Sequence, residues 1–133
     1  MMKNTLTAVL IAATLSGCAT TADPQRQAVL NEINRTIPTC AGADDCNVKW
    51  EAAQLWVVHN ARYKIQTATN VLIETYNPAD SSPYLAARVT KEPLGGGKYR
   101  MLVTVWCDNW IGCIPDQYEK ALDFNRTVAA AKP

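Results

Sequence analysis

Four cysteines stand in two pairs of identical spacing, and this pattern constrains the fold more than any other feature of the chain. Cys40 and Cys46 enclose five residues, and Cys107 and Cys113 enclose another five. Each pair surrounds a loop that leads into a predicted helix. We expect the local disulfides Cys40–Cys46 and Cys107–Cys113, because each would hold a loop where a helix must be positioned; the two crossed pairings remain alternatives.

The same four thiols suggest zinc as a second use, but their spacing argues against it. Structural zinc sites usually have two to four residues between paired cysteines, whereas five separate them here. In an oxidising compartment such thiols form disulfides first. We therefore predict no metal site and no other cofactor.

The fifth cysteine, Cys18, follows an apolar segment near the start of the chain. Lys3 supplies one positive charge, and residues 5–15 are all apolar or small. Eleven helical residues span about 16 Å, roughly half the hydrocarbon thickness of a bilayer. This segment therefore predicts a signal peptide and not a permanent transmembrane helix.

The sequence Leu15-Ser16-Gly17-Cys18 resembles the bacterial lipobox, in which an aliphatic residue and two small residues precede a lipidated cysteine. The resemblance implies that Cys18 carries a diacylglyceryl group, that cleavage follows Gly17, and that the new amino terminus is acylated, as with palmitate. An ordinary secretory signal with a chance cysteine is the alternative. The predicted organisation is a lipoprotein signal peptide (1–17), a short tether (18–23) and one domain (24–133).

The residue after Cys18 bears on where such a lipoprotein would go. It is Ala19 and not Asp, and by resemblance to enterobacterial sorting rules this implies the outer membrane. We separately expect the domain to face the periplasm. The tether is short, since five or six extended residues span at most about 20 Å. We expect the domain to lie near the membrane surface.

Charge and composition exclude some classes of partner. Lys and Arg number 13 against 12 Asp and Glu, and residues 18–133 are formally neutral because Lys3 lies outside them. A neutral domain has no long-range attraction to nucleic acid, so we predict none as a partner. Hydrophobic residues make up 48% of the chain, as in proteins with a packed core.

The periodicity of apolar residues predicts an α+β fold. Helices are expected over 24–35, where Asp23-Pro24 is a start signal, and over 46–60 and 116–130. After Asn60 the period changes to two, which predicts strands at 63–67, 71–76, 85–92 and 98–106. Hairpins without a long crossover favour an antiparallel meander of about four strands, with helices packed on one face.

No sequence pattern selects a catalytic residue. His59 is the single histidine, and no G-x-S-x-G motif accompanies it. Gly95-Gly96-Gly97-Lys98 is followed by Tyr99 where a phosphate loop needs Ser or Thr, so we interpret it as a hairpin turn. Four carboxylates are scattered without a spacing that pairs two of them: Glu74, Glu92, Asp108 and Asp116.

The loop between Cys107 and Cys113 is the most suggestive surface feature. It carries Asp108, Asn109 and Trp110, and a constrained aromatic beside polar groups is suited to binding a glycan or protein. Of the two interpretations we favour the other, in which Trp110 folds back over the open edge of the core.

These observations favour a lipid-anchored cell-envelope protein that is not an enzyme. Beyond the lipobox, the domain resembles envelope lipoproteins of Gram-negative bacteria, and this resemblance brings no functional motif with it. We predict a binding or structural component of the outer membrane, attached through the lipid on Cys18, with an envelope protein or a glycan as partner. The alternative is a small envelope hydrolase acting on glycan or peptide, with residues assembled only in the fold.

Overall fold

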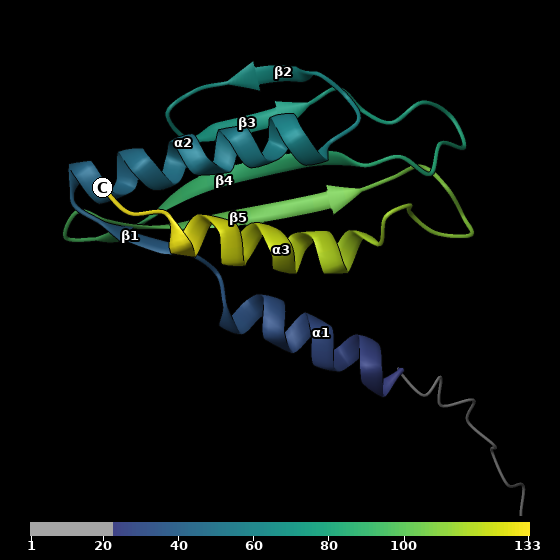
Figure 1. Cartoon of the computed structure of the whole chain (residues 1–133), viewed down its shortest axis with the longest axis horizontal. Coiled ribbons are helices and arrows are strands. Elements are labelled where there is room, and N and C mark those ends of the chain that lie inside the picture. Colours follow the sequence, from purple (N-terminus) through teal and green to yellow (C-terminus); the bar gives the residue numbers. More distant parts are fainter. Residues whose placement is uncertain (1–22) are drawn as a thin grey trace, which may run out of the picture.

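The computed structural model describes residues 23–133, and Figure 1 shows the arrangement of their elements. The predicted signal peptide and Cys18 lie outside the described residues. The elements follow in the order α1 (Pro24–Arg35), β1 (Thr39–Ala41), α2 (Ala43–Asn60), β2 (Ile65–Ala68), β3 (Leu72–Thr75), β4 (Ala86–Gly95), β5 (Lys98–Trp106) and α3 (Gln117–Ala130).

The sheet is antiparallel throughout, with the strand order β1-β5-β4-β3-β2. The predicted meander is confirmed in strands β2 to β5. The expected number of strands was one too low, because β1 adds a fifth strand on the far side of β5. In this strand Thr39 lies opposite Arg100 and Ala41 lies opposite Lys98.

The β4–β5 hairpin turns through glycines whose backbone conformation requires them. Gly96 and Gly97 have φ values of 62° and 74°, which L side chains rarely adopt. Gly95 lies opposite Lys98, and the register shifts between Pro93 and Gly95. This irregularity lets β4 continue to Gly95, beyond the predicted end at Glu92.

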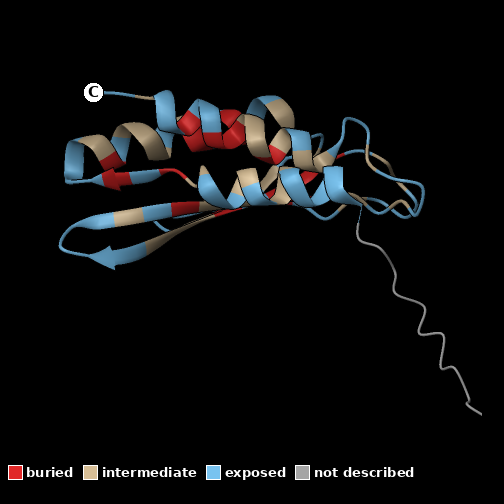
Figure 2. Ribbon diagram, turned by 90° about the horizontal axis from the view of Figure 1, so that it is seen from below, coloured by how far each residue is buried: buried red, intermediate tan, exposed pale blue. Residues whose placement is uncertain are grey.

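Helices α2 and α3 pack on the same face of the sheet, and the core lies between the layers (Figure 2). Trp56 of α2 meets Phe124 of α3 edge to face, with 5.2 Å between ring centroids. The core contains the following fully buried large side chains, among others: Phe124, Ile73, Met101, Val57, Val89 and Val128. The predicted α+β fold with helices on one face is therefore confirmed.

Helix α1 lies at the margin of this core and contains no buried residue (Figure 2). Its C-terminal end is held by Asn125 of α3, whose side-chain nitrogen donates to the Ile33 carbonyl at 2.9 Å and to Thr36 Oγ1 at 3.1 Å. At its other end the guanidinium of Arg26 lies 5.3 Å from the centre of the Tyr118 ring. Helix α1 is therefore attached mainly to α3.

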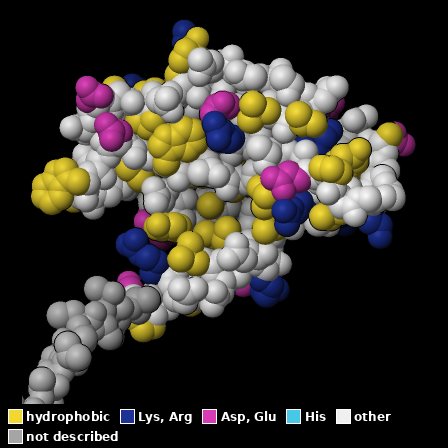
Figure 3. All heavy atoms as spheres, turned by 180° about the vertical axis from the view of Figure 1, so that it is seen from behind, with side chains coloured by type: hydrophobic (Ala, Val, Ile, Leu, Met, Phe, Trp, Pro, Cys, Tyr) yellow, Lys and Arg dark blue, Asp and Glu magenta, His cyan; other side chains and the backbone are white. Residues whose placement is uncertain are grey.

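The opposite face of the sheet is exposed and chemically mixed. Arg88 pairs with Glu74, and Arg100 pairs with Glu92 at 2.8 Å. Figure 3, which views the molecule from behind, shows such charged side chains among hydrophobic ones. This face is therefore not a continuous apolar surface.

Asp45 links the Cys40–Cys46 loop to the start of α2. Its carboxylate accepts a hydrogen bond from the Ala41 N–H at 3.0 Å and pairs with Lys49 at 3.0 Å. The backbone hydrogen bond, followed by the bond from Lys49, holds the pKa of Asp45 below its ordinary value of 3.8. A carboxylate whose pKa is lowered by folding stabilises the fold above that ordinary value, and the contribution is lost as the pH falls through the lower folded pKa.

We therefore expect Asp45→Asn to lower the thermal unfolding midpoint at neutral pH, and the gap from wild type to close in acid well below pH 3.8. Asp44→Asn is the matched control, since it removes the same charge from the same helical turn. Thermal melts across pH would reveal both effects. An equal loss in the two variants would show that net charge, and not the Ala41 and Lys49 contacts, is responsible.

Candidate functional site

The connection from β5 to α3 forms a loop closed by the Cys107–Cys113 disulfide, with the two Cα atoms 5.6 Å apart. Cys40 and Cys46 form the second disulfide, with Cα atoms 5.0 Å apart. The predicted local pairing is confirmed for both. Because all four sulfurs are in disulfides, none is available as a zinc thiolate.

The 107–113 loop is hydrogen-bonded to the connection between β3 and β4, around Ser81. Asp108 accepts a hydrogen bond from the Ser81 N–H at 3.0 Å, and the Asn109 side chain donates to the Ser81 carbonyl at 2.9 Å. The Asp108 N–H also donates to the Ser82 carbonyl at 3.0 Å. Two of the three predicted binding residues, Asp108 and Asn109, thus position the loop.

Trp110 extends from this loop into solvent. Its exposed fraction is 93%, so the favoured interpretation, in which it folds back over the core, is wrong. Ile111 and Ile114 are 79% and 67% exposed, which was not predicted from the sequence. We call Trp110, Ile111 and Ile114 the apolar tip. The sequence did contain an indication of this exposure, because these three large apolar residues lie outside every predicted helix and strand.

The backbone of the apolar tip is shaped by local contacts. Asn109 Oδ1 accepts a hydrogen bond from the Ile111 N–H at 3.0 Å, which turns the chain directly after Trp110. The Ile114 N–H donates to the Pro83 carbonyl at 2.8 Å. The disulfide and these hydrogen bonds fix the backbone on both sides of Trp110.

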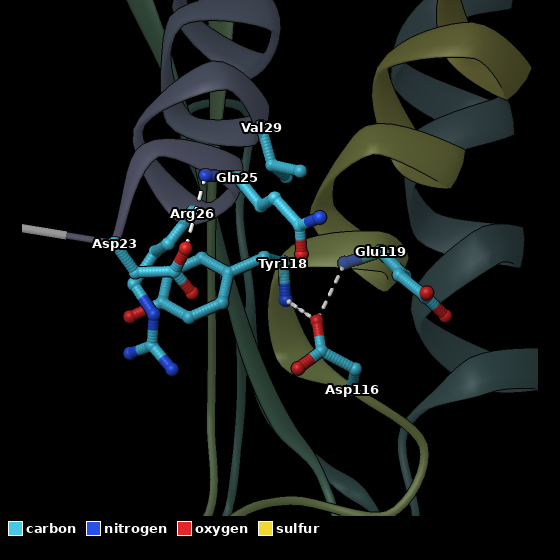
Figure 4. Close-up of a pocket in the computed structure, with 7 residues that line it drawn as sticks. All are labelled: Asp23, Gln25, Arg26, Val29, Asp116, Tyr118 and Glu119. Carbon is cyan, nitrogen blue, oxygen red and sulfur yellow. Dashed lines mark hydrogen bonds between the residues drawn. The ribbon is translucent and has the colours of Figure 1, made fainter.

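A groove of about 240 Å³ runs along the base of the apolar tip and includes Trp110, Tyr118 and Arg26. It adjoins a second groove of about 200 Å³ between the first turns of α1 and α3. Figure 4 shows this second groove, with Arg26 lying against Tyr118. Arg26, Asp116 and Tyr118 line both grooves, so the loop and the starts of two helices meet at one end of the domain.

The two aspartates in the second groove cap the two helices. Asp23 accepts a hydrogen bond from the Gln25 N–H at 3.0 Å. Asp116 accepts hydrogen bonds from the N–H groups of Tyr118 and Glu119 at 2.9 and 3.0 Å (Figure 4). Both carboxylates satisfy helix N-termini, as the sequence predicted for Asp23.

The remaining candidate residues are not assembled into a second site. His59 is exposed in the last turn of α2, and Glu74 and Glu92 are engaged with arginines on the open sheet face. Within residues 23–133, no group of three or more His, Cys, Asp or Glu could hold a metal ion. In the same part of the chain, no helix is both long enough and apolar enough to cross a membrane.

The fold and the loop define a small α+β domain with two local disulfides and an exposed apolar tip beside the start of its first helix. Comparisons with protein-family models, with curated proteins and with solved structures give no match to this chain.

Proposed function

We propose that this chain is a lipid-anchored, non-catalytic component of the outer membrane that faces the periplasm and makes contact through its apolar tip. The observation that carries the proposal is Trp110, which is 93% exposed on a disulfide-closed loop beside the start of α1. Several large apolar side chains exposed together are typical of interaction surfaces, whereas single ones are common on any protein. A rigid aromatic offers a large contact area at low entropic cost.

The anchor follows from the sequence that precedes the domain. Cys18 ends the lipobox-like sequence, and Asp23, the N-cap of α1, comes five residues later. Five extended residues span at most about 18 Å. A lipid on Cys18 would therefore keep the start of α1, and the apolar tip beside it, close to the membrane.

The non-catalytic role is supported by what the polar side chains at this end of the domain do. Asp108 and Asn109 hold the loop, and Asp23 and Asp116 cap helices. A hydrolase needs a carboxylate pair or a nucleophile and base free to meet a substrate. These groups are used to position backbone, which favours a binding or structural role.

Labelling with radioactive palmitate tests the anchor directly. We expect wild-type protein to be labelled and to lose residues 1–17, and Cys18→Ala to be neither labelled nor cleaved after Gly17, because it lacks the acceptor thiol. Ser16→Ala is the matched control, because it keeps a small residue before the cysteine and should be labelled normally. An unlabelled wild-type protein would refute the lipoprotein proposal.

A further inference from the structure

We propose that the apolar tip inserts into the interfacial region of the same bilayer that holds the lipid on Cys18. The partner of the loop is then a lipid surface, contacted by Trp110, Ile111 and Ile114. This inference rests on the proposed function, since the lipid anchor brings the domain to the membrane. The tip would act as a second attachment point that orients the domain.

The composition of the tip matches the chemistry of a bilayer interface. Trp110 is 93% exposed, and Ile111 and Ile114 add further apolar surface at 79% and 67% exposure. Tryptophan is enriched where hydrocarbon meets water, because its ring is largely apolar while its N–H can remain hydrogen-bonded. Isoleucine side chains beside it gain free energy by leaving water.

The position of the tip makes the bilayer its nearest large surface. Trp110 and Arg26 line one groove, and Arg26 and Asp23 line the adjoining one. Figure 1 shows the start of α1 and the β5–α3 connection at the same end of the molecule. Since Asp23 is five residues from Cys18, anchor and tip can reach one membrane plane together.

The lipid on Cys18 and the apolar tip belong to one chain, and this strengthens the contact of the tip with the bilayer. Once the lipid on Cys18 is inserted, contact of the tip with the bilayer is an intramolecular event with a high effective concentration. The loop is also ordered in advance by the Cys107–Cys113 disulfide and by the hydrogen bonds to Ser81. Little conformational entropy remains to be lost on insertion.

The charges around the tip indicate an apolar contact and not an electrostatic one. Arg26 is the basic residue of the two grooves, and it lies near the acidic residues Asp23, Asp116 and Glu119; Asp108 is in the loop itself. The two grooves therefore carry no excess of positive charge that would attract anionic lipid. We expect the contact to form on a zwitterionic bilayer and to persist at high salt concentration.

Quenching by brominated lipids tests the insertion. The full-length lipidated protein is reconstituted in phosphatidylcholine vesicles with bromine atoms near the headgroup end of the acyl chains. We expect strong quenching of tryptophan fluorescence in the wild type and loss of most of it in Trp110→Phe. The variant should fold normally, because the Trp110 side chain is exposed.

Trp50→Phe is the matched control for this experiment. Trp50 lies on α2, and its indole N–H donates to the Thr69 carbonyl at 3.1 Å, in the connection between β2 and β3. That connection lies at the end of the sheet opposite the loop (Figure 1). Replacing Trp50 should leave the absolute loss of emission on adding brominated lipid unchanged, so the quenched fraction should not fall.

The outcomes separate this inference from the proposed function. If Cys18 carries palmitate but bromine quenches wild type and Trp110→Phe equally, the tip is not in the bilayer and the inference fails while the anchor stands. A photo-crosslinking residue at position 110 that captures a protein or glycan in cells, and not lipid, would also overturn it. Absence of palmitate on Cys18 would remove both proposals.

Discussion

Replacing Phe124 with alanine should lower the free energy of unfolding by about 3 to 5 kcal/mol, the usual cost of truncating a buried aromatic side chain. Phe124 is fully buried and meets the Trp56 ring at 5.2 Å between centroids, with the ring planes at 86°. Its loss would leave a cavity between α3 and α2 and would remove an edge-to-face contact. Equilibrium denaturation in urea would measure the change.

Trp110→Ala is the control for this measurement, because it truncates a larger aromatic in a position with the opposite environment. Trp110 is 93% exposed, so its removal should change the free energy of unfolding by no more than about 0.5 kcal/mol. A comparable loss in the two variants would show that Trp110 packs on the domain. That result would contradict both the exposure of the apolar tip and the role proposed for it.

Removing the Cys40–Cys46 disulfide by double alanine substitution should cost about 3 to 4 kcal/mol, against about 2 kcal/mol for Cys107–Cys113. The two bonds close loops of equal length, so their effects on the unfolded chain are alike. They differ in burial, because Cys40 and Cys46 are 3% and 5% exposed and belong to the core. The additional loss of stability for Cys40–Cys46 comes from the cavity that the missing sulfur atoms leave in the core.

Equilibrium unfolding of the two double variants without reductant would provide the comparison, after peptide mapping has shown that the remaining pair is oxidised. Equal losses would mean that the sulfurs of the Cys40–Cys46 bond contribute no packing. The Cys107→Ala/Cys113→Ala variant has a further use, because it loosens the loop that carries Trp110. We expect it to retain the fold while weakening the lipid quenching described above.

The elements that the sequence predicted well are those specified by local chemistry. Asp23 accepts a hydrogen bond at the start of α1, as expected of an aspartate directly before helical periodicity. Helix α3 begins at Gln117, next to the predicted start at residue 116. Strand β5 has the predicted bounds, because alternation and a glycine turn define it locally. These signals depend on neighbours within a few residues.

The features that escaped prediction depend on distant parts of the chain. Strand β1 has three residues, and its existence follows from pairing with β5, about sixty residues later. Helix α2 begins at Ala43, after Gly42 with a φ of 80°, and not at Cys46 as expected. A short strand and a glycine that begins a helix carry little periodicity of their own.

The candidate loop was found from the sequence, but its orientation was not. The matched cysteine spacing identified residues 107–113, while the exposure of Trp110 depends on how that loop packs against Ser81, a contact between residues nearly thirty positions apart. Exposure is a property of what covers a side chain. The exposure of Trp110 could therefore not be predicted from the spacing of residues within the loop.

The β4–β5 hairpin gives the proposed attachment a geometric consequence. Strand β5 runs from Lys98, next to the glycine turn, to Trp106, next to the disulfide loop, and nine residues at about 3.3 Å each make a length of about 30 Å. With the loop end at the bilayer, the turn at Gly96–Gly97 would face the aqueous compartment at the far end of the sheet. The C-terminus lies at that same far end (Figure 1), so a fluorescent domain fused there would report height above the membrane without touching the attachment surface.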